Sequence, residues 1–154
     1  MLTVIVTISA LFLLGFTNPR TGLSESCIFP AQIGCRAYAM NTSGNLALDI
    51  GQDTGHDITI FAIKCTQQPN PSLDAVAFTI TIANGDHALI TTSAVRCYKL
   101  DEAGEPVVAA GAAGSVYKGK VYIQYNERDS GFMHVVVGDV TLKYGDVVLP
   151  EAAP

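Results

Sequence analysis

The chain has 154 residues, of which 49% are hydrophobic, and its formal net charge is −5 at pH 7. A negatively charged chain lacks the basic surface that nucleic acid or an anionic lipid headgroup requires, so the composition argues against nucleic-acid binding. Once an N-terminal stalk and linker are set aside, the remaining length fits a single domain of about 100 to 150 residues. The sequence therefore predicts one domain with its own core.

The N-terminus is the most apolar part of the chain. Residues 1–19 carry no charged side chain, and within the run 2–16 only two threonines, a serine and a glycine interrupt the apolar residues. We expect a hydrophobic helix over 1–17, because the residue before Pro19 is forced out of helical geometry. Its buried residues are expected to be Leu2, Val4, Ile5, Val6, Ile8, Leu11, Phe12, Leu13, Leu14 and Phe16.

The length of this run limits what it can do. At about 1.5 Å per helical residue it spans roughly 20 to 25 Å, which is less than the hydrocarbon core of about 30 Å. No Lys or Arg precedes Arg20, so the run also lacks the cationic start of a secretory signal peptide. Either further residues precede Met1, or the run is buried in a bundle of like helices. The β-branched residues 4–6 permit a third possibility, an extended segment that completes a neighbour's sheet.

Four cysteines, at positions 27, 35, 65 and 97, form an even set without any Cys-x-x-Cys spacing. This pattern is typical of two disulfides in an oxidising or extracellular setting and not of a zinc site. Three pairings are open. The turn residues between Phe29 and Gly34 favour Cys27 with Cys35 and, consequently, Cys65 with Cys97.

From residue 27 onward the apolar residues alternate with a period of two, which predicts β-strands with one buried face. We expect an α+β protein: the helix of 1–17, a hinge over 18–26, and a head domain of 27–154 built as an immunoglobulin-like β-sandwich of about seven to nine strands. Asn84-Gly85 predicts a hairpin, and residues 109–115 a loop. The alternating residues are Leu46, Leu48, Ile50, Ile58, Ile60, Val76, Phe78, Ile80, Ile82, Val121, Ile123, Tyr125, Val140, Leu142 and Tyr144.

The sequence predicts no catalytic, metal or cofactor site. Its three histidines lack the short spacing of metal ligands, and Asp49, Asp53 and Asp57 do not follow the spacing of an EF-hand calcium loop. No serine occupies a nucleophile-elbow motif, so an enzyme is not expected. Asn41-Thr42-Ser43 matches the acceptor pattern for an N-linked sugar, which predicts glycosylation at Asn41.

Several segments together resemble archaeal type IV pilin-like proteins. The resemblance covers nearly the whole chain, but the short cationic leader and cleavage site of such pilins are not present in it. The segments that carry the resemblance are Leu14-Gly15-Phe16-Thr17-Asn18-Pro19, Cys27-Ile28-Phe29-Pro30 with Gly34-Cys35, Asn41-Thr42-Ser43-Gly44, Gly55-His56-Asp57-Ile58-Thr59-Ile60 with Cys65, Gly119-Lys120-Val121-Tyr122-Ile123, and His134 to Lys143.

The resemblance implies a structural subunit of an extracellular pilus that serves adhesion. Its partners would be other copies of itself in a helical homopolymer and the pilus assembly machinery, with the membrane as its location before assembly. A head-to-tail contact that does not close into a ring gives an open filament of this kind. The alternative is a membrane-anchored extracellular β-domain that binds a ligand or sugar.

Overall fold

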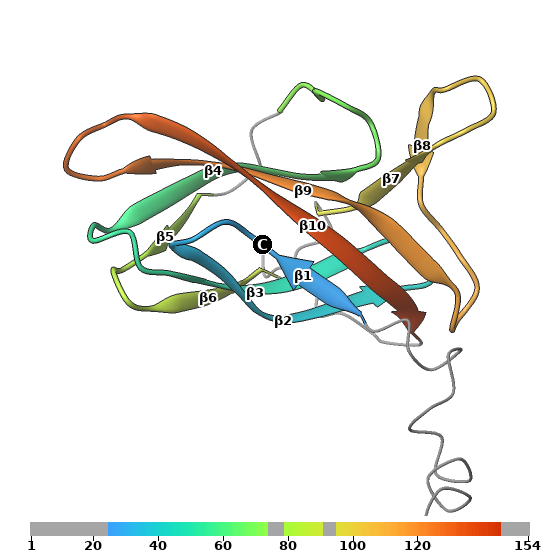
Figure 1. Ribbon diagram of the computed structural model, residues 1–154, viewed down its shortest axis with the longest axis horizontal. Helices are drawn as coiled ribbons and strands as arrows, with labels where there is room; N and C mark the ends of the chain where they lie inside the picture. The colour runs from blue at the N-terminus through green and yellow to red at the C-terminus, as the bar shows by residue number, and fades with distance from the viewer. Residues whose placement is uncertain (1–24, 74–78, 91–94, 146–154) are drawn as a thin grey trace, which may run out of the picture.

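The computed structural model describes residues 25–73, 79–90 and 95–145, and these form ten β-strands (Figure 1). The strands are β1 (Ser26–Ile28), β2 (Ile33–Asn41), β3 (Leu46–Gln52), β4 (Ile58–Thr66), β5 (Ile80–Ile82), β6 (His87–Ile90), β7 (Cys97–Leu100), β8 (Pro106–Val108), β9 (Val116–Glu127) and β10 (Met133–Gly145).

The ten strands belong to one sheet that curls back on itself. Their order is β6-β3-β2-β10-β9-β4-β7-β8, with β1 paired to β10 and β5 paired to β4. In Figure 1, β2, β3 and β6 lie on one side of the core, and β4, β9 and β10 on the other. The long strand β10 joins the two halves: it runs antiparallel to β9 from Met133 to Lys143, and then Tyr144 and Gly145 pair in parallel with β2.

The expected α+β class is wrong. The described residues contain no helix, and therefore none long and apolar enough to cross a membrane. The immunoglobulin-like sandwich is also wrong, because the register of Tyr144 with Met40 and Gly145 with Asn41 connects the halves into a single sheet. The helix expected over 1–17 and most of the hinge 18–26 lie outside the described residues, and the first strand begins at Ser26.

The predicted alternation is confirmed where the structure describes it. The apolar faces of β3, β4, β9 and β10 meet in one core between the two halves of the sheet. Val76 and Phe78 lie outside the described residues. The side chains that are 2% exposed or less include Leu46, Leu48, Ile50, Ile58, Ile60, Ile82, Val121, Ile123, Val140 and Leu142.

The two disulfides have the pairing that the sequence favoured. Cys27–Cys35 connects β1, which belongs with β10, to β2 in the other half of the sheet. Cys65–Cys97 connects directly opposed residues of β4 and β7. Only one further residue pair, Thr66 with Tyr98, belongs to this short parallel ladder, so the second disulfide anchors the β7–β8 hairpin to the sheet.

Asn84-Gly85 forms a turn but not the predicted hairpin. The strand before it, β5, pairs with β4, whereas the strand after it, β6, pairs with β3. The buried side chain of Gln52 fixes this crossover: its Nε2 donates to the carbonyl oxygens of His56 (2.9 Å) and Ile82 (3.0 Å). The turn therefore carries the chain from one half of the curled sheet to the other.

Residues 109–115 form the connection between β8 and β9, and its first part covers the core. Ala109 is fully buried, and its carbonyl oxygen accepts a hydrogen bond of 2.7 Å from the Tyr144 hydroxyl. A Cβ atom added at Gly111 would lie 2.5 Å from the Tyr144 ring, so only glycine fits at this position of the connection. The small residues of this segment allow the close approach.

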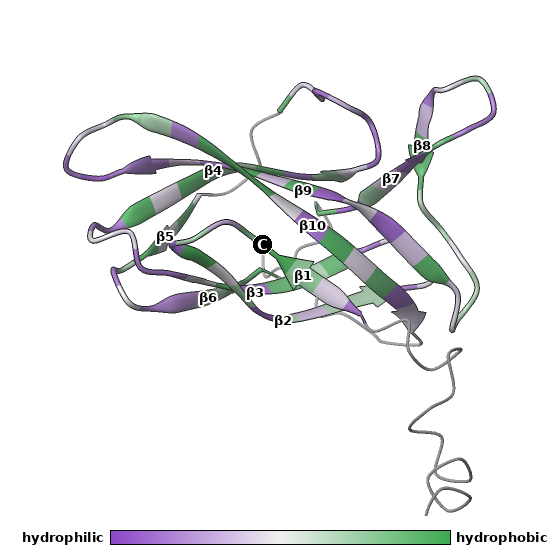
Figure 2. Ribbon diagram, in the orientation of Figure 1, coloured by the Kyte–Doolittle hydropathy of each residue, from purple (hydrophilic) through white to green (hydrophobic). Residues whose placement is uncertain are grey.

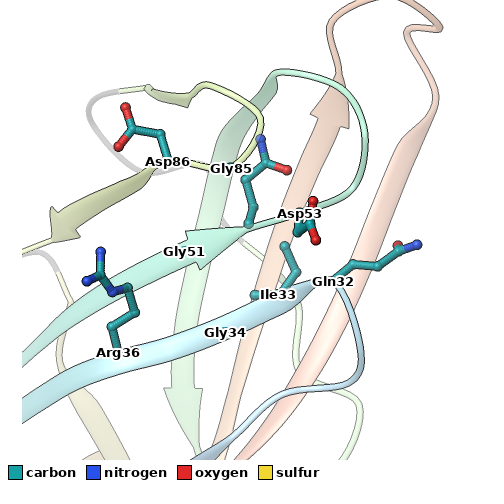
Figure 3. Close-up of a pocket in the computed structure, with 9 residues that line it drawn as sticks. Gln32, Ile33, Gly34, Arg36, Gly51, Asp53, Gly85 and Asp86 are labelled. Atoms are coloured by element: carbon teal, nitrogen blue, oxygen red, sulfur yellow. The ribbon is translucent and has the colours of Figure 1, made fainter.

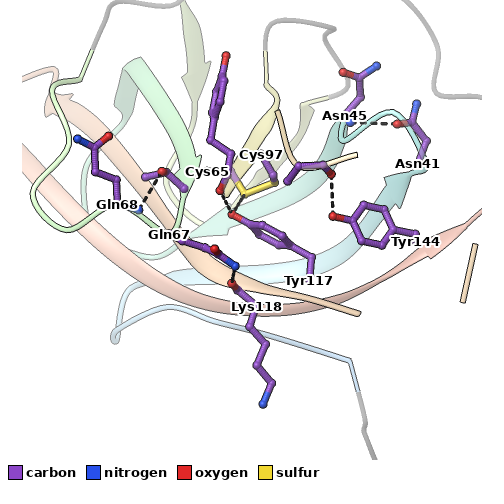
Figure 4. Close-up of a disulfide and its surroundings, with 12 residues drawn as sticks. Asn41, Asn45, Cys65, Gln67, Gln68, Cys97, Tyr117, Lys118 and Tyr144 are labelled. Atoms are coloured by element: carbon purple, nitrogen blue, oxygen red, sulfur yellow. Dashed lines mark hydrogen bonds between the residues drawn. A yellow bond between two sulfur atoms is a disulfide. The ribbon is translucent and has the colours of Figure 1, made fainter. Parts of the chain in front are cut away.

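Tyr117 on β9 lies beside the Cys65–Cys97 disulfide (Figure 4). Its side chain is 3% exposed, and its hydroxyl donates a hydrogen bond of 2.6 Å to the carbonyl oxygen of Tyr98. Burial, and secondarily the neighbouring Tyr144, raise the pKa of the Tyr117 phenol above its usual value. Burial also raises the pKa of Tyr144.

The two disulfides are expected to contribute unequally to stability. They span sequence separations of 32 and 8 residues, and a longer closed loop restricts the unfolded chain more. Cys65→Ala/Cys97→Ala should lower the free energy of unfolding by roughly 4 kcal/mol and Cys27→Ala/Cys35→Ala by roughly 2.5 kcal/mol. Urea unfolding of both variants without reductant measures the difference, and an equal loss in the two variants would contradict it.

The buried tyrosines predict a loss of stability at alkaline pH. The folded-state pKa of Tyr117 is raised, so the unfolded chain loses the phenol proton at a lower pH than the folded chain does. The contribution of the protonated phenol to stability is therefore complete below about pH 10 and declines above it. In Tyr117→Phe the free energy of unfolding should fall less steeply with pH in this range. Urea unfolding from pH 8 upward tests this, with Tyr122→Phe on the outward face of β9 as the matched control. Parallel curves for Tyr117→Phe and the parent chain would contradict the prediction.

Candidate assembly surface

A row of exposed apolar side chains follows β10 on the outside of the curled sheet. We call this row the β10 stripe. It comprises Phe132 (70% exposed), Met133 (52%), Val135 (53%) and Val137 (36%), together with Ile28 (65%) of the neighbouring strand β1. Figure 2 shows this half of β10, next to the loop that joins it to β9, as predominantly hydrophobic.

The stripe results from β10 having apolar residues on both of its faces. Alternate residues of a strand point to opposite sides of the sheet, so Val136 packs against the core while Val135 and Val137 point outward. Ile28 is in register with Asp139 and so continues the outward row, whereas Phe132 is an exposed residue of the loop just before β10. An antiparallel sheet with one solvent-exposed face normally carries polar residues in these outward positions.

The residues of β9 directly beside Met133, Val135 and Val137 are uncharged. The residues of β9 in register with Met133, Val135 and Val137 are Asn126, Gln124 and Tyr122. Charges begin at the next outward pair, where Lys120 Nζ lies 3.7 Å from Asp139 Oδ1. Beside Met133, Val135 and Val137, the border of the stripe toward β9 is therefore without charge.

The backbone of β10 beside the stripe has an open edge. On one side β10 pairs with β9 along nearly its whole length. On the other side, within the described part of the chain, it pairs with β1 only at 139–141 and with β2 only at 144–145. Residues 133–138 therefore present one edge without a strand partner among the described residues, and such an edge is a template for another strand.

Strand β1 ends at this open edge for a local reason. Pro30 follows soon after Ile28 and cannot donate a backbone hydrogen bond to a sheet. Phe29 turns inward, and its ring occupies the place where a side chain at position 138 would lie: a Cβ added to Gly138 would be 2.5 Å from it. Phe29 and the Cys27–Cys35 disulfide thus fix β1 against one end of β10, and no described strand pairs with this edge of 133–138.

The chain enters the domain at the opposite end of β10 from the stripe. Strand β1 runs antiparallel to β10, with Ser26 in register with Thr141. The Glu25 carboxylate accepts a hydrogen bond of 2.8 Å from the backbone N–H of Lys143. The expected polymerisation residues, from Leu2 to Phe16, precede this point and lie outside the described residues.

The three histidines do not come together. His56 Nδ1 lies 3.1 Å from Asp129 Oδ2, and His87 Nδ1 lies 2.8 Å from Asp49 Oδ1. His134 stacks on the ring of Tyr125 at a centroid distance of 5.3 Å. Among the described residues, no group of three His, Cys, Asp or Glu side chains is arranged to hold a metal ion.

The aspartates that were considered for calcium have other partners. Asp49 bonds His87, as above, and Asp57 Oδ1 accepts a hydrogen bond of 3.1 Å from the backbone N–H of Asn84. Asp53 lies instead at an open groove of about 730 Å³ on the outside of β2 and β3 (Figure 3). Its other polar lining residues are Gln32, Arg36, Gln52 and Asp86.

Asn41, the predicted glycosylation residue, lies at the turn between β2 and β3. Its side-chain oxygen accepts hydrogen bonds from the backbone N–H groups of Ser43 (3.1 Å) and Asn45 (3.0 Å), as Figure 4 shows for Asn45. The Nδ2 atom, to which a sugar would attach, makes no hydrogen bond with the described residues. The side chain is half-buried, and its glycosylation stays a prediction.

Sequence reasoning missed the β10 stripe, although the sequence contains a signal for it. The three consecutive valines 135–137 place apolar side chains on both faces of one strand. In an antiparallel sheet, this pattern indicates that the outward face of the strand is also apolar and is expected to be buried against a partner.

Comparisons with family models, with curated proteins and with solved structures give no match to this chain.

Proposed function

We propose that this chain is a structural subunit of an extracellular filament of the archaeal type IV pilus class, which assembles by burying the apolar segment 2–16 among copies and serves adhesion. The uncharged stretch 1–19 supports the proposal, because a run of this kind in water is covered by lipid or by protein. The observation that carries it is the exposed β10 stripe, a second apolar surface on the same chain that calls for a partner.

The two disulfides support an oxidising, extracellular setting. Within such a filament, the curled sheet would form the wall and segment 2–16 the interior. The subunit would reside in the membrane before assembly and would require the assembly machinery that the resemblance implies. Its work is mechanical, so no catalytic residue and no cofactor enter the proposal.

A second candidate is a membrane-anchored binding domain, and the groove beside β2 and β3 favours it. Arg36, Asp53 and Asp86 line this groove, and Arg36 forms no ion pair with the described residues. Gly34 and Gly51 are in register across the two strands, and the Arg36 side chain lies beside Gly51. Such a surface suits a polar ligand such as a sugar.

A charge within the apolar segment is expected to prevent assembly. In the full chain, Leu13→Glu should raise the protein concentration required for assembly by roughly 100-fold, because burial of a carboxylate in an apolar environment is strongly unfavourable. The chain is purified in detergent, the detergent is removed, and the product is examined by sedimentation and electron microscopy. Thr21→Glu adds the same charge in the hinge and serves as the matched control.

The same experiment separates the two candidate functions. Filaments from the parent chain and from Thr21→Glu, but not from Leu13→Glu, are the expected result. A parent chain that stays monomeric in detergent and inserts into vesicles instead of forming filaments would support the binding domain. Assembly of Leu13→Glu at the same concentration as the parent would contradict the proposed function.

A further inference from the structure

We infer that the β10 stripe is the docking site for the apolar segment 2–16 of a second copy of this chain. The inference rests on the proposed function and names the surface through which it is carried out. It commits to one occupant, which the chemistry of the stripe, its dimensions and the path of the chain all favour.

The first argument is the match in chemistry. Segment 2–16 contains no charged residue, so it cannot pair with a charge on the surface that covers it. A suitable docking surface is therefore itself uncharged, because a buried charge without a partner is unfavourable. The residues of β9 in register with Met133, Val135 and Val137 are uncharged. The surface changes to charged residues at Lys120 and Asp139, where the stripe ends. The part of the stripe formed by Met133, Val135 and Val137 therefore has the uncharged border toward β9 that an uncharged ligand requires.

The second argument is the match in length. From Met133 to the level of Ile28, the stripe covers six residue steps of β10, or about 20 Å at roughly 3.3 Å per residue. Fifteen residues span about 22 Å even at the short rise of 1.5 Å per residue, and more when extended. Segment 2–16 is therefore long enough to cover the whole stripe.

The third argument concerns the backbone. The open edge 133–138 lies next to the stripe and offers hydrogen-bonding groups to an added strand. The residues 2–9 alternate apolar side chains on one face and include a run of β-branched residues, a composition that favours strand pairing. A docked segment can thus contact the stripe through side chains and the edge through its backbone.

The path of the chain favours a second copy over the same copy. The N-terminal residues enter the domain at Glu25, which is bonded to Lys143. Because β1 runs antiparallel to β10, its first residue, Ser26, lies at the end of β1 that is farther from the stripe. The same copy would have to reverse its direction within the hinge, whereas a neighbouring copy can present the segment without such a turn. A contact of this head-to-tail kind propagates into an open filament.

Substitution of the stripe tests the inference on the full chain. Val135→Lys should raise the concentration required for assembly by about tenfold or more, since docking would bury an ammonium group against an apolar segment. Val135→Thr retains the β-branched shape and should raise it less. Leu89→Lys is the matched control, because Leu89 is 64% exposed on β6 in the other half of the sheet, and it should assemble like the parent.

A photo-crosslinking residue at position 135 identifies the occupant directly. Copies with and without a heavy isotope label are mixed in detergent and assembled, and the cross-linked peptides are identified by mass spectrometry. Cross-links between heavy and light copies that join position 135 to residues 2–16 are expected. Cross-links confined to single copies, or to other segments, would overturn the inference.

The two proposals fail separately. If Leu13→Glu assembles like the parent, the proposed function is wrong and the docking site loses its basis. If Leu13→Glu blocks assembly while Val135→Lys does not, the filament stands and the β10 stripe is not its docking site. The far-ultraviolet circular dichroism of each stripe variant must match the parent, and Val135→Thr supplies the second test if the lysine variant does not fold.

Discussion

The length of β10 and its several pairing partners determine the shape of the whole domain. This strand pairs with β9 along one edge and, along the other, with β1 and then with β2. Because it is shared by both halves, the sheet must curl, and the apolar faces of β3, β4, β9 and β10 are enclosed between its two halves. The same strand extends beyond β1 at its beginning, so one edge of 133–138 has no strand partner in the part of the chain that the structure describes. The enclosed core and the exposed stripe are thus two consequences of one strand.

Local patterns in the sequence were sufficient to find the buried faces of the strands. Period-two alternation identified Leu46, Leu48 and Ile50 because a side chain's face depends only on its position along its own strand. The separation of Cys27 and Cys35 by a turn likewise favoured the correct pairing. The buried face of a strand and the Cys27–Cys35 pairing both depend on residues that are close in the sequence, so the spacing of residue types is sufficient to predict them.

The expectations that failed depend on which strands pair with which. The turn at Asn84-Gly85 has the composition of a hairpin, yet the two flanking strands bond to β4 and β3, and the buried Gln52 is among the residues that hold this arrangement. The immunoglobulin-like sandwich failed for a similar reason, since two residue pairs between β10 and β2 decide whether one sheet or two is formed. Non-local pairing of this kind leaves no trace in the residues of either strand. The candidate surface was missed because alternation directs attention to a single apolar face, whereas β10 has two.

The outer face of the sheet offers an internal comparison that bears on the role of the stripe. Toward the end of β10, the outward positions hold Asp139, Thr141 and Lys143, and their partners on β9 include Lys118 and Lys120. At its beginning the outward positions hold Met133, Val135 and Val137, and neither lysine nor proline protects the open edge 133–138. Natural sheets usually guard such edges with charge, proline or a cover, because an unguarded apolar edge associates with other chains. Charged side chains occupy the outward face at the end of β10, whereas its beginning is apolar. We therefore interpret the beginning of β10 as a surface that a partner covers. Of the chemistries that the chain itself provides, the uncharged N-terminal segment of another copy fits that surface on charge, on length and on the direction of approach.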